Sequence, residues 1–525
     1  MKEKNATTPT MNAIQLGLFA SRIEAVCDEM GAILRNAAFS PNIRDRLDFS
    51  CAVFDATGKL CAQAAHIPVH LGSMAFAMAD VVNQMHWHPG DQLILNDPYM
   101  GGTHLPDVTL IAPVFVEDEL QAFVVNRAHH ADIGGDTPGS MPISSHLDEE
   151  GIIIKPVLLL NRGEKSAEVW QRIIRDTGNP QESEGDLSAQ ISANSAGIQR
   201  LQGLIGQQGA DHFQRGLVAL NDYAARIAHQ ALCAIPDGEY VFTDYLDDDG
   251  QGHTDIPVKV CLSVAGGDIH VDFSGTADQV AGNVNCPLSV AAAAVYYVFR
   301  CLMPAHTPAC AGAFRHIQLQ AEAGSLLNSR YPAAVAAGNV ETSTRIVDVV
   351  MGALAQAIPE RMASASHGSM NNVAMGSNAP DDRWDYYETI GGGMGASRGQ
   401  PGTDAVHTHM TNTLNTPVEV LEQRHPLRIR RYQIRRDSGG TGQYPGGDGL
   451  IREFQFLAPA EFTLLTERRR HRPWGIDGCG YGKAGENLLN GEKLPGKCHR
   501  HARTGDVLTL ITPGGGGCGS QDHSP

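Results

Sequence analysis

Two histidines and one aspartate, His104, Asp107 and His129, have the residue types and spacing that best suit chemistry. The first two lie three positions apart in a glycine-rich run, and the third lies in a later His-His-Ala-Asp run. Neutral imidazole nitrogen and carboxylate oxygen are ligands that divalent transition metals take in proteins. These residues therefore form a candidate metal site, although glycine-rich turns and strand-end histidines are also ordinary structural features.

A predicted β-hairpin positions these side chains. Two apolar runs, 108–115 and 121–125, are separated by an acidic tetrapeptide at 116–119, which is typical of two strands and a turn. Antiparallel pairing places residue 107 opposite residue 128 or 129, so the carboxylate and one imidazole meet at the open end of the hairpin. His130 and Asp132 follow at once, and we expect one of them to act as a general base or to orient the metal ligands.

Further polar residues precede the hairpin. Asp45 lies in a charged segment that enters a strand at 51–55, where acidic and basic side chains often just pair with each other. His66 and His70 lie between that strand and a helical stretch at 73–85. We take both histidines as candidates for catalysis or for the pocket wall, although a lone histidine is more often structural. Glu150, after the hairpin, could help to orient the imidazoles, although a solvated turn is the more ordinary expectation.

Composition limits the classes of partner. The chain has 525 residues, 42% hydrophobic and 19% charged, with 40 basic and 58 acidic residues and a net charge of −18. This acidic balance argues against nucleic acid or an anionic membrane as a partner. The 11 cysteines form no CxxC pair, no signal peptide is evident, and the longest apolar run is too short to span a bilayer. We expect a soluble, cytoplasmic protein.

The periodicity predicts a mixed α/β (α+β), multidomain fold. Helices are expected at 11–36 and through most of 165–230, and alternating strands begin near residue 240. We therefore predict an N-terminal metal-site domain at 1–230 and a β-rich C-terminal region with Gly/Pro turns at 231–525. A helix at 343–356 is expected there, capped by Thr342 or Ser343, with an anion site possible at its start. No Walker A or GxGxxG nucleotide motif is present.

Several motifs together resemble the B subunits of ATP-dependent hydantoinases. The same superfamily includes the second half of 5-oxoprolinase, related lactamase subunits and the α-subunits of acetone-type carboxylases. The resemblance spans nearly the whole chain in order. The runs that carry it include NIRDRLDFSCAVFD (42–55), HPGDQLILNDPYMGGTHLPDVTLIAPVF (88–115), VVNRAHHADIGGDTPGSMP (124–142), GNVNCP (282–287), AAVAAGNVETSTRIVDVVMGALA (333–355) and SGGTGQYPGGDGLIREF (438–454).

The resemblance implies an enzyme that hydrolyses a cyclic amide with an A-type ATPase partner subunit, in a hetero-oligomer expected to be α2β2. The partner would use ATP and Mg²⁺ to phosphorylate the substrate's oxygen, and this chain would open the ring at its metal. The implied ligands are His104, Asp107, His129 and Asp45, where the family usually has glutamate. Mn, Zn and Fe all suit this donor set. The alternative is a subunit of an ATP-dependent acetone-type ketone carboxylase, and the sequence leaves hydantoin, 5-oxoproline and larger lactams open as substrates.

Overall fold

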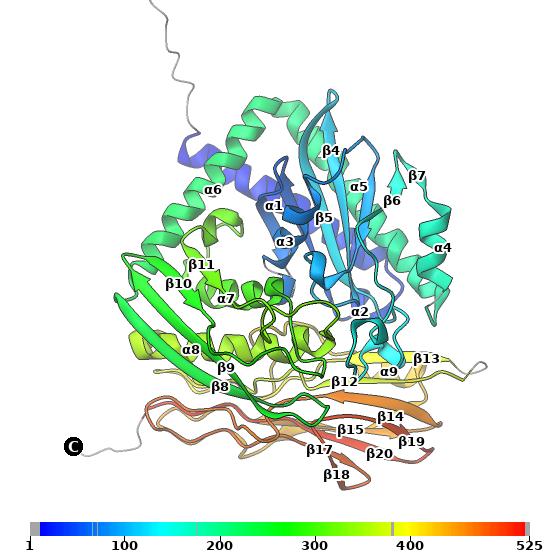
Figure 1. Ribbon diagram of the computed structural model, residues 1–525, viewed down its shortest axis with the longest axis vertical. Helices are drawn as coiled ribbons and strands as arrows, with labels where there is room; N and C mark the ends of the chain where they lie inside the picture. Colours follow the sequence, from blue (N-terminus) through cyan, green and yellow to red (C-terminus); the bar gives the residue numbers. More distant parts are fainter. Residues whose placement is uncertain (1–10, 66, 71, 176, 380–382, 520–525) are drawn as a thin grey trace, which may run out of the picture.

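In the computed structural model of the protein, residues 11–65, 67–70, 72–175, 177–379 and 383–519 are described. The chain forms a mixed α/β fold with four antiparallel or mostly antiparallel sheets and several long helices, which confirms the predicted fold class. In Figure 1 the N-terminal half lies at one end of the molecule and the last strands of the chain lie at the other.

The N-terminal half is built on a seven-stranded sheet with the order β2-β1-β5-β4-β3-β6-β7. Its central strands are buried along most of their length, which explains why they read as continuous apolar runs and not as alternating ones. The strands are β1 (Phe49–Asp55), β2 (Leu60–Ala65), β3 (Gln92–Leu95), β4 (Asp107–Val116), β5 (Glu119–His129), β6 (Val157–Asn161) and β7 (Glu164–Lys165).

Helices cover both faces of this sheet. The long helices α1 and α5 share one hydrophobic core with β1, β4 and β5, whereas α3 packs with apolar side chains of the opposite face. Asn12 caps α1 through a reciprocal capping box with Gln15, which fixes where the first helix begins. The helices of this half are α1 (Ala13–Ala37), α2 (Pro41–Arg44), α3 (Ser73–Val81), α4 (Ala167–Arg175), α5 (Pro180–Gln208) and α6 (Ala210–Leu232).

A second layer begins where α6 ends. Figure 1 shows this helix running from the N-terminal half down to a four-stranded sheet with the order β11-β10-β9-β8, which packs against α7 and α8. The run 247–250 lies at the end of β8 and in the hairpin turn to β9, where Asp248 pairs with Thr254, which agrees with the predicted turn. The elements are β8 (Gly238–Asp248), β9 (Thr254–Ala265), β10 (Asp268–Asp272), α7 (Leu288–Leu302), β11 (Ile317–Gln320) and α8 (Ser343–Ala357).

The C-terminal part contains two more sheets, ordered β13-β12-β16-β19 and β14-β15-β20-β17-β18, whose apolar faces share one core. This confirms the β-rich character expected for the segment. The elements are β12 (Asn372–Ser377), β13 (Trp384–Glu388), α9 (Val418–Arg424), β14 (Leu427–Arg435), β15 (Gly449–Phe456), β16 (Ala460–Leu465), β17 (Glu486–Leu489), β18 (Glu492–Leu494), β19 (Lys497–Ala502) and β20 (Val507–Ile511).

Two details differ from the sequence-based expectations. Helix α8 is preceded by a π-helical turn, and its start is buried, so the expected side-chain cap is wrong. The hydroxyl of Thr342 donates instead to the carbonyl of Val284, and the hydroxyl of Ser343 donates to the carbonyl of Asn339. Helix α7 was not predicted, because its alanine-rich apolar run carries no polar face. The domain boundary near residue 230 stays a prediction.

Among the described residues, no helix combines the length and the apolar character needed to cross a membrane.

Candidate metal centre

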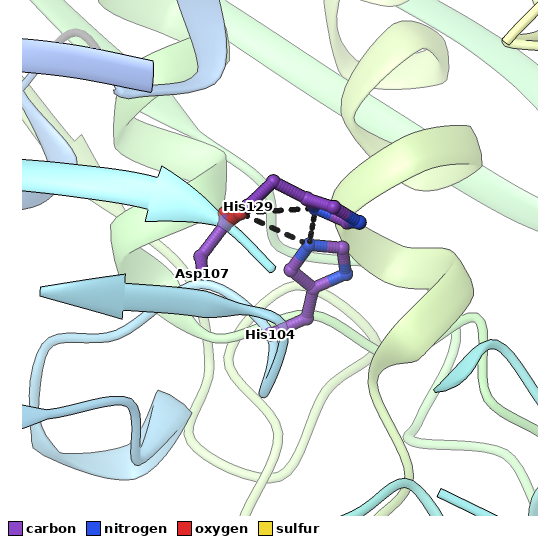
Figure 2. Close-up of side chains that lie close together, drawn as sticks. All are labelled: His104, Asp107 and His129. Carbon is purple, nitrogen blue, oxygen red and sulfur yellow. Dashed lines mark hydrogen bonds and ion pairs between the residues drawn. The ribbon is translucent and has the colours of Figure 1, made fainter. Parts of the chain in front are cut away.

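The β4–β5 hairpin brings the three candidate ligands together. Asp107 is the first residue of β4 and His129 is the last residue of β5, and the two are direct partners in the antiparallel register. His104 lies in the turn before β4, where its carbonyl oxygen accepts a hydrogen bond from the Asp107 N–H at 3.1 Å. The register expected from the apolar pattern is therefore confirmed, and Figure 2 shows the three side chains pointing toward one another.

The donor atoms form a nearly equilateral triangle. Oδ1 of Asp107 lies 3.3 Å from Nε2 of His104 and 3.2 Å from Nδ1 of His129, and the two nitrogens are 3.3 Å apart. All three side chains are buried. A tetrahedral divalent ion with bonds of about 2.1 Å separates its ligand atoms by roughly 3.4 Å. The triangle therefore has the size that such an ion requires without rearrangement of the backbone.

The charges in this triangle are unequal. Burial acts to raise the pKa of Asp107, but the imidazoles around it outweigh burial and hold that pKa well below its usual range. Burial acts to lower the pKa of His104, and the facing Asp107 carboxylate reverses this and raises it. Burial lowers the pKa of His129, which favours its neutral form. A carboxylate and a neutral imidazole are the forms that bind metal ions.

The second oxygen of Asp107 is also held in place. Oδ2 accepts a hydrogen bond from the Thr103 hydroxyl at 2.5 Å and one from Nδ2 of Asn339 at 3.5 Å. Nε2 of His70 lies 3.4 Å from the same oxygen, while Nδ1 of His70 lies 3.0 Å from the hydroxyl of Ser50. The structure thus brings His70, one of the predicted candidates, into contact with the cluster.

Two further imidazole nitrogens are buried beside the triangle. Nε2 of His129 makes no hydrogen bond within the described part of the chain, and Nε2 of His70 has the Asp107 carboxylate as its neighbour at 3.4 Å. A small cavity of about 20 Å³ adjoins them, roughly the space for one water molecule or one ion. Its wall contains Asp48, Ile67, Val69, His70, His104, Asp107, His129, Asn339, Val340, Met370, Tyr387, Thr389, Met410, Thr411, Asn412 and Thr413.

Asp48, and not Asp45, lies at this cavity. Asp45 follows α2 and forms an ion pair with Arg44 at 3.1 Å, and it is not among the described residues of the cavity wall. Asp48 immediately precedes β1, and its carbonyl oxygen accepts the His129 N–H at 3.0 Å. The position of Asp48 follows from the pairing of β1 with β5. Residue 49 lies opposite residue 128, so residue 48 lies beside residue 129.

The structure places His130 and Asp132 elsewhere. Nε2 of His130 lies 2.9 Å from the side-chain oxygen of Gln190 on α5. The carboxylate of Asp132 accepts hydrogen bonds from the N–H groups of Gly134 and Gly178, which order the surrounding loop. Both residues line a separate cavity of about 420 Å³ between α5 and β13. The structure therefore does not bring them to the metal cluster, and His66 lies outside the described residues.

Glu150 was expected in a solvated turn, and this is wrong. Its carboxylate is buried and accepts hydrogen bonds from the N–H groups of Val335 and Ala336 and from the hydroxyl of Ser144. The carbonyl oxygen of Ala336 lies 3.3 Å from Nδ1 of His104, on the ring edge away from the cluster. A metal-binding histidine typically donates its second N–H to such an acceptor. Glu150 thus fixes the segment before α8 whose carbonyl oxygen orients His104.

An aromatic wall from the C-terminal half completes the centre. The ring of Tyr387 stacks on His129 with centroids 4.7 Å apart and planes 21° apart. The guanidinium of Arg46 also lies over the Tyr387 ring, 4.8 Å from its centroid, and donates to the Tyr387 carbonyl oxygen at 2.9 Å. No signal in the sequence links these residues, because Tyr387 lies in β13, far along the chain from the hairpin.

Comparison with known proteins places this fold and site in a family. The sequence model described as Hydantoinase B/oxoprolinase matches residues 12–521. 5-Oxoprolinase 1 of Arabidopsis thaliana is 38% identical over 97% of this chain, and the chain spans only 42% of that relative. The B-type subunit of a putative D-/L-hydantoinase from Pseudomonas sp. (strain NS671) is 33% identical, with 97% of this chain and 90% of the relative covered.

A solved structure extends the likeness to three dimensions. The ATP-dependent caprolactamase from Pseudomonas jessenii superposes with a TM-score of 0.89 at 27% identity, covering 98% of this chain and 92% of that one. The family match extends over nearly the whole chain and includes all three residues of the metal triangle. The chain belongs to the hydantoinase B/oxoprolinase family.

Proposed function

We propose that this chain is the metal-binding, ring-opening part of an ATP-dependent cyclic amide hydrolase. The observation that carries the proposal is the buried triangle of His104, Asp107 and His129, with edges of 3.2 to 3.3 Å. The relatives support the reaction class, because 5-oxoprolinase, hydantoinase and caprolactamase are all names of enzymes that act on a cyclic amide.

The proposed division of labour follows from amide chemistry. The carbonyl of an unstrained cyclic amide is a poor electrophile, and phosphorylation of its oxygen creates a good leaving group. We propose that an A-type ATPase partner performs this step, since the chain carries no recognisable nucleotide motif. The chain spans 42% of the Arabidopsis relative and 90% of the Pseudomonas relative, so the corresponding region occurs in relatives both within a longer chain and as a nearly full-length one.

The residues of the cavity have distinct proposed roles. His104, Asp107 and His129 hold the divalent ion, for which Mn, Zn and Fe are the candidates. When bound, the ion would supply a positive charge that polarises the bonds of the activated ring carbon. It would also lower the pKa of water, so that water loses a proton more readily at neutral pH. His70 is the proposed proton carrier, with its Nδ1 3.0 Å from the Ser50 hydroxyl and its Nε2 3.4 Å from Oδ2 of Asp107. Asp48 provides a second carboxylate at the cavity wall.

The reaction class is tested with the full chain and its A-type partner, ATP, Mg²⁺ and added Mn²⁺. Phosphate release and product formation are measured with hydantoins, 5-oxoproline, simple lactams and ketones, each with and without bicarbonate. We expect a ring-opened acid from one class of cyclic amide without a need for bicarbonate. A carboxylated ketone formed only with bicarbonate would overturn the hydrolase proposal in favour of the ketone carboxylase.

The metal role is tested by a matched pair of variants on adjacent residues of the same strand end. His129→Ala removes one corner of the triangle, whereas His130→Ala removes an imidazole that faces the other cavity. We expect the first variant to lose the ion of this centre and the second to keep it, as measured by elemental analysis of purified protein. Equal metal content in both variants would remove His129 from the ligand set.

A further inference from the structure

A second cluster of potential metal ligands lies on the surface, where α6 meets the four-stranded sheet. His229 is in the last turn of α6, and Cys233 caps the helix four residues later, so both side chains lie on one helix face. Asp268 is the first residue of β10, and His316 immediately precedes β11. Strands β10 and β11 pair in parallel, which brings the last two residues side by side. The metal centre uses none of these four residues.

Three of these side chains are close enough to share one ion, and Cys233 lies beside them. One nitrogen from each histidine and one oxygen of Asp268 lie within 4.8 Å of one another. Nδ1 of His316 lies 2.7 Å from Oδ1 of Asp268, and the two imidazole rings have centroids 4.4 Å apart. Sγ of Cys233 lies 3.9 Å from both ring nitrogens of His229. The cluster thus combines two imidazoles, a carboxylate and a thiol from three separate segments.

The hydrogen bonds leave one nitrogen of His229 available for a metal. Nε2 of His229 lies 3.1 Å from the carbonyl oxygen of Gly266, and a carbonyl only accepts, so this nitrogen carries the hydrogen. Histidines that bind metals characteristically donate their second N–H to a backbone carbonyl or to a carboxylate, and His229 shows this arrangement. Nδ1 of His316 lies beside Oδ1 of Asp268, so in the proposed site an ion replaces the hydrogen between these two atoms.

The backbone is also shaped around the cluster. A Cβ at Gly267 would lie 2.6 Å from Sγ of Cys233 and 3.0 Å from Nε2 of His229, and this residue has a φ of +89°. Only glycine therefore lets the β9–β10 turn lie directly against the end of α6. Arg315, the residue before His316, forms an ion pair with Asp222 at 3.0 Å. Its positive charge is therefore not the partner of the cluster.

We propose that His229, Asp268 and His316, with Cys233 as a fourth donor, bind a zinc-type divalent ion. Nitrogen and sulfur donors favour Zn²⁺ and its transition-metal relatives over Ca²⁺ and Mg²⁺, which take oxygen ligands. The ion ties the last turn of α6 to the starts of β10 and β11, across the predicted boundary near residue 230. Because it binds the folded protein, it stabilises the junction between the two halves.

The test uses the metal-stripped full chain titrated with Zn²⁺ and, in parallel, with Co²⁺. Equilibrium dialysis with metal quantification counts the bound ions, and the visible spectrum of Co²⁺ reports the ligands. We expect wild type to bind one ion more than His316→Ala and one more than Asp268→Asn. The second variant is informative if the first misfolds, because the Asp268 side chain is 74% exposed. Cys233→Ser is expected to lose the thiolate-to-cobalt absorption band.

Two controls separate this site from others. His129→Ala is expected to lose the ion of the buried centre and to keep the surface ion, so failure of one proposal is visible independently of the other. His146→Ala removes an exposed histidine that pairs with Asp148 at 3.2 Å, and it is expected to keep both ions. Unchanged ion counts in His316→Ala and Asp268→Asn, or an equal loss in His146→Ala, would overturn the proposed site.

Discussion

Replacing Asp48 with asparagine is expected to weaken metal binding, whereas the same change at Asp45 is expected to leave it intact. Asp48 lines the cavity beside His129, and its negative charge raises the pKa of that imidazole, which means that it stabilises positive charge there. Asp45 instead pairs with Arg44, and their side chains are 23% and 37% exposed. The pair of variants therefore changes one carboxylate at the centre and one away from it.

The size of the effect follows from the role of Asp48. Loss of a group that supports metal ligands typically costs about 10- to 100-fold in metal affinity, or about 1.4 to 2.8 kcal/mol. The variant loses the ion pair between Asp48 and the buried Arg46 at 3.9 Å. The fold is expected to survive, because Arg46 keeps its hydrogen bonds to Asn42 at 3.1 Å and to the Tyr387 carbonyl at 2.9 Å. At Asp45 only a partly exposed ion pair is lost, which costs about 0 to 1 kcal/mol of folding stability.

The assay is a competition titration of each purified variant with a metal indicator, using Mn²⁺ and Zn²⁺ separately. Metal-dependent turnover with the A-type partner is measured in parallel, and thermal unfolding of the metal-free proteins checks the fold. We expect a 10- to 100-fold weaker affinity for Asp48→Asn and wild-type affinity for Asp45→Asn. A larger loss at Asp45 than at Asp48 would refute the reasoning and return Asp45 to the ligand set implied by the family resemblance.

Two further predictions concern buried charges. Burial raises the pKa of Glu150 to about 7 from 4.5, so its protonated form contributes stability that is complete below pH 4.5 and is lost as pH rises through 7. Relative to Glu150→Gln, wild type is expected to lose roughly 3 kcal/mol of unfolding free energy between pH 4.5 and pH 8. The measurement is urea unfolding at several pH values, and an equal pH dependence of the unfolding free energy in the two proteins would contradict the prediction. Arg345 lies fully buried against Asp244, Asp348 and Glu467 at 3.2 to 3.3 Å. Arg345→Leu is expected to cost about 3 to 5 kcal/mol in urea unfolding, because it removes one of the buried cations that neutralise these carboxylates and leaves only Arg468 and Lys497 beside them. A cost below that of an ordinary surface change would argue against a structural role for this network.

The ligand triangle could be predicted from the sequence because one hairpin creates it. The apolar runs and the acidic turn determine the register, and the register places Asp107 opposite His129. The walls of the cavity could not be predicted in this way. Tyr387 and Asn339 reach the centre through tertiary packing of segments remote in sequence, and no periodicity reports such contacts. His130 was misleading because adjacent strand residues face opposite sides, so its ring points to a different cavity from that of His129.

The division of the centre between the two halves bears on how a substrate reaches it. The ligands come from the β4–β5 hairpin, whereas Tyr387 and the segment 410–413 close the cavity from the C-terminal half. A space of about 20 Å³ holds one small species and not a ring. Arg46 holds the wall closed through its hydrogen bond to the Tyr387 carbonyl at 2.9 Å and through its contact with the ring face. If the chain opens a cyclic amide as proposed, this wall has to move for the ring to reach His104, Asp107 and His129.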